Sequence, residues 1–124
     1  MIACHCGVLY AVADTAVELA RKYANFYAEI TLTPVCAGII DYLVEGCGPD
    51  RVLYGSDMPM RDPRQQLGWV VYSRLLLDQK QAVLGGNAQW IMFGSTRRTR
   101  HRRERHLAQQ TPCRMRFSTQ RTRF

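Results

Sequence analysis

Three short apolar segments at a regular spacing constrain this chain more than any other feature. They end near Cys6, Ile30 and Tyr54, so that successive ends lie 24 residues apart. Their aliphatic, aromatic and β-branched residues favour strands, and the residues between them follow a helical pattern. Strand and helix alternating at this spacing predict right-handed β-α units joined in a parallel sheet. The predicted fold class is therefore α/β.

The expected helices follow from apolar periodicity and from their end signals. The first covers residues 8–23, with an apolar face of Val12, Ala16, Leu19, Ala20 and Tyr23. The second covers residues 35–45, opened by Pro34 and ended by Gly46 and Gly48. A third runs over residues 63–77, with Leu67, Val70, Val71 and Leu75 on its apolar face. Two short helices are expected over residues 79–84 and 87–93, with Asp78 and Asn87 as their N-caps and with Gly85 and Gly86 ending the first of them.

The stretch from Arg51 to Pro63 is the most informative single segment. It reads as a buried strand that stops at Gly55, where the backbone bends or another group approaches closely. Asp57 then lies at the carboxyl end of the strand, where parallel α/β proteins gather their reactive groups. The alternative is that Asp57 only caps a turn. Asp62, ahead of Pro63, is predicted to be a helix N-cap and not a reactive group.

Charge divides the chain into two parts. Residues 1–94 hold seven basic and nine acidic side chains, a net charge of −2, whereas residues 95–124 hold ten Arg, no Lys and one Glu, a net charge of +9. The second part has no apolar periodicity, so it is predicted to be a disordered or irregular tail. One interpretation is that this tail binds nucleic acid through phosphate contacts. The other is that it is a shifted reading frame of a GC-rich gene, which explains arginine without lysine.

Cysteines and hydropathy bear on the compartment. The five cysteines (4, 6, 36, 47 and 113) include no Cys-x-x-Cys pair, so neither a disulfide framework nor a structural zinc site is predicted. Free, buried cysteines are typical of a reducing cytosol. No apolar run is long enough to span a membrane, and the first residues lack the basic start and apolar core of a secretion signal. The expected location is cytoplasmic.

Four segments together resemble the carboxyl-terminal part of the amidohydrolase-related family. They are His5-Cys-Gly7, Asn25-Phe-Tyr-Ala-Glu-Ile-Thr31, Gly48-Pro-Asp-Arg-Val-Leu-Tyr-Gly-Ser-Asp-Met-Pro59 and Leu84-Gly-Gly-Asn-Ala88. The family consists of metal-dependent hydrolases and decarboxylases built on a (β/α)8 barrel. The resemblance implies that residues 1–94 are a partial barrel with its last three β-α units, strands six to eight.

The resemblance also implies roles for individual residues. Asp57 matches the eighth-strand aspartate, which ligates the catalytic divalent metal (zinc or similar) or takes the proton of the attacking water. His5 matches the sixth-strand histidine that orients or polarises the water or substrate. Arg61 is a candidate for holding a carboxylate of a small-molecule substrate, although a solvated loop arginine is the alternative, and Glu29 is expected to be structural. We expect His5 and Asp57 to end neighbouring strands and to face a common mouth.

The chain also departs from the family pattern. The first-strand His-x-His pair and the fifth-strand histidine have no counterpart, because His5 is the only histidine before residue 95. A metal site needs about three or four protein ligands. We therefore expect a fragment of a metal-dependent amidohydrolase that is inactive alone. Its expected partner is a missing amino-terminal half or a second copy, since exposed parallel strand edges favour pairing. The alternative function is a non-enzymatic chain that binds nucleic acid or polyanions through residues 95–124.

Overall fold

A computed structural model describes residues 1–31 and 36–94 of the chain. The expectations for the basic tail over residues 95–124 lie outside the described residues. The same holds for the predicted start of the second helix at Pro34 and Val35. Within the described part, Met1–Gly94 belong to one compact unit.

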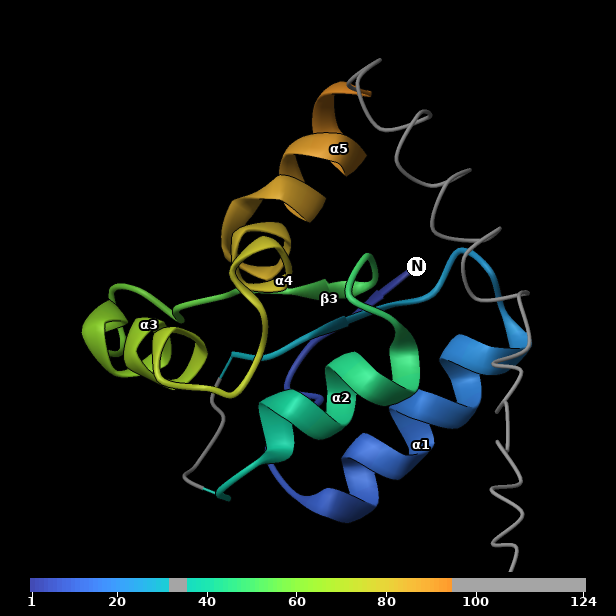
Figure 1. Cartoon of the computed structure of the whole chain (residues 1–124), viewed down its shortest axis with the longest axis horizontal. Helices are drawn as coiled ribbons and strands as arrows, with labels where there is room; N and C mark the ends of the chain where they lie inside the picture. Colours follow the sequence, from blue (N-terminus) through green and yellow to red (C-terminus); the bar gives the residue numbers. More distant parts are fainter. Residues whose placement is uncertain (32–35, 95–124) are drawn as a thin grey trace, which may run out of the picture. The chain divides into compact units, whose positions relative to one another are not determined.

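The centre of this unit is a three-stranded parallel sheet (Figure 1). Its strands are β1 (Ile2–Ala3), β2 (Tyr27–Glu29) and β3 (Val52–Leu53), in the order β1-β2-β3. Ala28 pairs with Ala3 on one side and with Val52 on the other. The predicted α/β class with a parallel sheet is confirmed. β1 ends three residues before the expected Cys6, and β2 and β3 each end one residue before the expected Ile30 and Tyr54.

Helices α1 (Tyr10–Lys22) and α2 (Ile39–Cys47) pack side by side on one side of the sheet, as Figure 1 shows. The buried stripe of α1 is made of Ala13, Ala16, Val17 and Ala20, while Val12 and Tyr23, expected on the apolar face, are exposed. Positions 13, 16, 17 and 20 follow the i, i+3, i+4, i+7 spacing of one helix face, which Val12 and Tyr23 do not share.

Gly46 was expected to end the second helix, but it lies inside α2. A Cβ at this position would come within 2.4 Å of the Val17 Cγ2 atom, so the glycine lets α2 approach α1 closely. The helix ends at Gly48, which has a φ of 94° and is the C-cap residue. It begins at Ile39, after Gly38 in the left-handed region, four residues later than the sequence predicts.

Helix α3 (Pro63–Val71) begins as predicted and ends earlier. Asp62 is its N-cap, because its carboxylate accepts a hydrogen bond from the backbone N–H of Arg64 at 2.9 Å. The helix was expected to continue to residue 77, with Leu67 and Val71 buried, but both are exposed. The Ser73 hydroxyl donates to the carbonyl of Val70 at 2.7 Å, which satisfies one of the last carbonyls and ends the helix there.

The last helical segment is continuous where two helices were predicted. It consists of α4 (Leu77–Gln81), a π-helical turn η1 (Ala82–Gly86) and α5 (Asn87–Phe93). Its N-cap is Leu76, whose N–H donates to the Gln79 Oε1 atom at 3.0 Å, and not Asp78. Gly85 and Gly86 do not end the helix, because the π-helical turn carries the backbone through them.

Asn87 was predicted to be an N-cap and has another role. Its side chain is 1% exposed, and its Nδ2 donates to the carbonyls of Pro49 at 2.7 Å and Val52 at 2.8 Å. The Val83 carbonyl of η1 accepts from the Tyr54 N–H at 3.0 Å. The helical segment is therefore tied directly to β3.

The core lies between the sheet and these helices. Its largest fully buried apolar side chains are Phe26, Ile30, Ile39, Leu43, Val44, Val52, Val70 and Val83. Among the described residues, no helix combines the length and apolar character needed to cross a membrane.

Candidate active site at the carboxyl edge of the sheet

A polar side chain follows each of the three strands. His5 lies two residues after β1, Thr31 two residues after β2, and Asp57 four residues after β3. Because the strands are parallel, their carboxyl ends meet at one edge of the sheet. The predicted pair does not end neighbouring strands, since β2 lies between β1 and β3. Thr31 therefore occupies the position between the strands of His5 and Asp57.

His5 and Asp57 share an unusual backbone conformation. Their φ angles are 63° and 59°, and no other non-glycine residue in the described ranges has a positive φ. Left-handed conformations cost an L-residue about 1–2 kcal/mol, although Asp and His tolerate them better than most. Such conformations cluster at functional sites, where the surrounding structure holds them. The two residues singled out from the sequence are thus also distinguished by their backbone.

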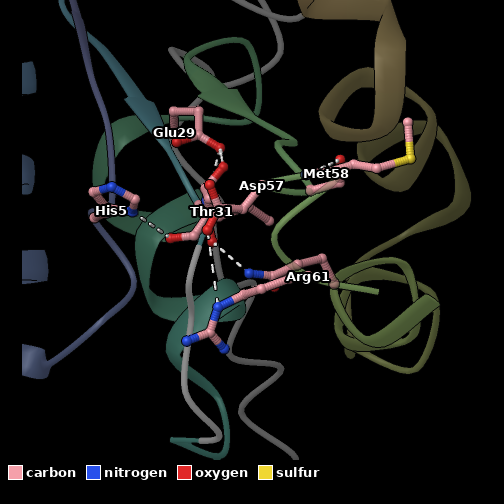
Figure 2. Close-up of polar contacts among 9 residues, drawn as sticks. His5, Glu29, Thr31, Asp57, Met58 and Arg61 are labelled. Atoms are coloured by element: carbon pink, nitrogen blue, oxygen red, sulfur yellow. Dashed lines mark hydrogen bonds and ion pairs between the residues drawn. The ribbon is translucent and has the colours of Figure 1, made fainter. Parts of the chain in front are cut away.

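His5 is exposed and is held through one ring nitrogen. Its Nδ1 atom lies 3.2 Å from the Thr31 carbonyl oxygen (Figure 2). A carbonyl oxygen only accepts hydrogen bonds, so the Nδ1–H donates in this contact. The lone pair of the neutral imidazole is then on Nε2.

Asp57 is paired with Arg61 within the loop that follows β3. The Arg61 Nε atom lies 3.8 Å from the Asp57 Oδ2 atom, and the Arg61 N–H donates to the Asp57 carbonyl at 3.2 Å. The Arg61 side chain is 51% exposed and the Asp57 side chain 29% exposed, so this ion pair is weak and leaves both groups accessible. Arg61 lies beside the carboxylate in Figure 2.

Two further residues join this edge that the sequence did not single out as site residues. Glu29 and Thr31 are each 8% exposed. The Thr31 N–H donates to the Glu29 Oε1 atom at 2.7 Å, and the Thr31 hydroxyl donates to the same oxygen. In the sequence, Gly55 indicates that something approaches closely but not which side chains do. In the structure, a Cβ at Gly55 would lie 1.8 Å from Glu29 Oε1 and 2.1 Å from Thr31 Oγ1. Of the two alternatives predicted at Gly55, a backbone bend or a close approach, the structure shows the close approach.

The cysteines of the described part are free. Cys6 and Cys47 are buried as expected, and burial raises the pKa of the Cys47 thiol to about 11. Cys4, next to His5, is exposed; partial desolvation and then the charge of Glu29 raise the pKa of its thiol.

The described residues do not make a complete metal centre. Within residues 1–31 and 36–94, no three His, Cys, Asp or Glu side chains lie close enough together to hold a metal ion. In the part of the chain that the structure describes, the one buried carboxylate oxygen without a hydrogen-bond partner belongs to Glu29 and not to Asp57. The donor set at this edge thus falls short of the three or four ligands that a site needs.

A family model described as amidohydrolase matches residues 1–91. The chain belongs to the amidohydrolase family. Its fold is similar to that of 5-carboxyvanillate decarboxylase from Sphingomonas paucimobilis (18% identity, TM-score 0.56), covering 73% of this chain and 32% of that one. It is also similar to amidohydrolase 2 from Bifidobacterium longum subsp. infantis (22% identity, TM-score 0.52), covering 71% of this chain and 37% of the other.

This amidohydrolase-family chain thus spans about a third of the length of the solved structures that it matches. No curated protein matches it in the sequence comparison. At these identities the solved structures support the fold alone, which agrees with the parallel sheet and its covering helices.

Proposed function

We propose that residues 1–94 are the last three β-α units of an amidohydrolase-type (β/α)8 barrel, with β1, β2 and β3 as its sixth, seventh and eighth strands. The family match, the parallel strand order and the coverage of about a third of each solved structure support this assignment. Three strands do not close a barrel. The remaining strands come from outside these residues, through an amino-terminal half or self-association.

The activity that this site serves is hydrolysis or decarboxylation of a small substrate. Asp57 is the proposed proton acceptor and the one proposed ligand of the divalent metal that this family generally uses. His5 is proposed to polarise the substrate or water through Nε2. The observation that carries the proposal is the shared left-handed backbone of His5 and Asp57 at one edge of the sheet.

Arg61 is the proposed contact for a substrate carboxylate. Its guanidinium is half-exposed beside Asp57, where a planar fork of donors binds a carboxylate well. Since the described residues lack a full set of metal ligands, we propose that the chain is inactive alone.

Manganese-induced broadening of NMR signals tests the proposed site in the whole chain. Mn²⁺ binds carboxylates, and its paramagnetism reveals weak occupancy residue by residue. We expect the broadening to be strongest around Asp57 and His5, and to weaken in Asp57→Asn and in His5→Gln. Glu18→Gln, which removes an exposed carboxylate on α1, is the matched control and should change nothing at residue 57. Broadening spread evenly over exposed carboxylates such as Glu18 and Glu45 would overturn the proposal.

A further inference from the structure

Three residues form a chain of hydrogen bonds that ends at the His5 ring. Glu29 Oε1 accepts from both the N–H and the hydroxyl of Thr31, and the Thr31 carbonyl accepts from His5 Nδ1 at 3.2 Å. Figure 2 shows this arrangement between β1 and β2. Thr31 lies beyond the end of β2, so strand pairing alone does not fix the direction of its carbonyl.

Burial makes the Glu29–Thr31 part of this chain rigid. Both residues are 8% exposed, and a hydrogen bond is stronger away from water than in it. Gly55 of the neighbouring segment leaves the space that the carboxylate and hydroxyl occupy. Residues after all three strands therefore contribute to one local arrangement.

A purely structural explanation accounts poorly for a carboxylate here. The second oxygen of Glu29, Oε2, is buried without a geometrically formed hydrogen bond among the described residues, which is costly for a polar group. The Cys4 thiol lies beside Glu29, and desolvation and then Glu29 raise the pKa of that thiol. A neutral side chain would hold the same turn with a smaller desolvation cost. What the carboxylate adds is a strong clamp on Thr31, the residue that His5 contacts.

We propose that Glu29 and Thr31 are positioning residues for His5. They hold the Thr31 carbonyl where it accepts the Nδ1–H, which leaves the lone pair on Nε2, the nitrogen facing the substrate. This inference rests on the proposed function only in assigning His5 its task. The tautomer is a property of the chain itself, and it is the opposite of the one that a solvated imidazole favours.

Nitrogen-15 NMR of the histidine rings in the whole chain measures the tautomer directly. His5→Gln identifies the His5 signals among those of the three histidines. At a pH high enough for the His5 ring to be neutral, we expect mainly the Nδ1–H form in the native chain. In Glu29→Leu the ratio of Nδ1–H to Nε2–H forms should fall by roughly fivefold, the factor for the net contribution of one hydrogen bond.

Conservative changes separate positioning from general support of the fold. Glu29→Gln keeps an acceptor for Thr31, but an amide oxygen is a weaker acceptor than a carboxylate, so its ratio should lie between those of the native chain and Glu29→Leu. Glu45→Leu, at an exposed site on α2, is the control for loss of a carboxylate. If Glu29→Leu does not fold, Thr31→Val is used instead. It replaces only the hydroxyl, and it should also lower the ratio of Nδ1–H to Nε2–H forms.

Two results would overturn the inference. One is a native His5 in the Nε2–H form, and the other is an unchanged ratio in a folded Glu29→Leu or Thr31→Val chain. The manganese experiment is independent of both. The expected tautomer without broadening at Asp57 would contradict the proposed function alone, and the reverse combination would contradict this inference alone.

Discussion

At the scale of single residues, Gly55 matters because it lies where two side chains of the neighbouring strand meet. A methyl group there would overlap Glu29 Oε1 and Thr31 Oγ1, both of which are buried. The glycine is therefore needed for space, and its position two residues before Asp57 links the packing of β2 to the loop that carries the carboxylate.

Gly55→Ala should destabilise the fold by about 1–3 kcal/mol, the usual cost of an added group in a packed site. Gly68→Ala in α3 is the matched control, because its Cβ would meet no atom within 4 Å. That change should stabilise the helix by about 1 kcal/mol. Urea unfolding of both variants measures the difference. Equal stabilities of the two variants would contradict the close approach at Gly55.

Asp62 gives a pH-dependent prediction at the start of α3. Hydrogen bonds from the Arg64 side chain, and then from its N–H, lower the pKa of the Asp62 carboxyl to about 2 from its usual 3.8. Because the pKa is lower in the folded state, the stabilisation is present above about pH 4 and is lost as the pH falls through about 2.

The measurement is a ¹³C NMR titration of the Asp62 carboxyl. The midpoint should lie near 2 in the native chain and should rise toward 3.8 in Arg64→Ala. Asp50→Asn, in the turn before β3, lies far along the chain from Asp62 and serves as the control, which should leave the Asp62 midpoint unchanged. A native midpoint at the usual value would show that the Asp62–Arg64 contact does not form in solution.

At the scale of the elements, some features could be predicted from sequence and others could not. Strand positions, strand direction and the Asp62 cap followed from local patterns that do not depend on packing. The role of Asn87 did not, because its partners are 38 and 35 residues away in sequence. Likewise, Gly46 resembles a helix end locally, and only the approach of Val17 explains it as an interior residue.

The candidate site divides in the same way. His5 and Asp57 could be selected from motif resemblance and from their places after strands. Glu29 and Thr31 could not, because their importance arises from contacts with the His5 ring and with the Gly55 backbone. The order β1-β2-β3, with Thr31 in the middle, is likewise a property of the assembled sheet.

Asn87→Ala tests the anchor between α5 and β3. The change would leave the partly buried carbonyl of Pro49 and the buried carbonyl of Val52 without the Asn87 donor, and we expect a loss of about 2–4 kcal/mol of unfolding free energy. A helix cap alone is worth about 1 kcal/mol. Gln89→Ala, at an exposed position of α5, serves as the control in the same denaturation experiment. If Asn87→Ala lowers the unfolding free energy by no more than the loss of a helix cap does, the anchoring role of Asn87 is refuted.

At the scale of the whole molecule, the uneven charge predicts where a polyanion would bind. Residues 1–94 carry a net charge of −2 and residues 95–124 a net charge of +9. If the second part binds nucleic acid, deleting it should abolish binding of a DNA duplex. The salt dependence of log K should have a slope no steeper than about −9, reached if all ten arginines contact phosphates.

Fluorescence anisotropy over a range of salt concentrations measures this binding. Arg61→Gln with Arg64→Gln, which lowers the charge of the first part by two, is the control and should have little effect. Retained binding after deletion of residues 95–124 would place the polyanion site on residues 1–94 and contradict the prediction.

The central claim is that β1, β2 and β3 are parallel neighbours whose carboxyl ends bring His5, Thr31 and Asp57 to one edge. Scalar couplings across hydrogen bonds, measured by NMR in the whole chain, test it most directly. The account predicts couplings from the Cys6 N–H to the Glu29 carbonyl and from the Ile30 N–H to the Leu53 carbonyl, whose N···O distances are 2.9 and 3.0 Å. Couplings that instead join these amides to antiparallel partners, or that are absent from a folded chain, would contradict the claim.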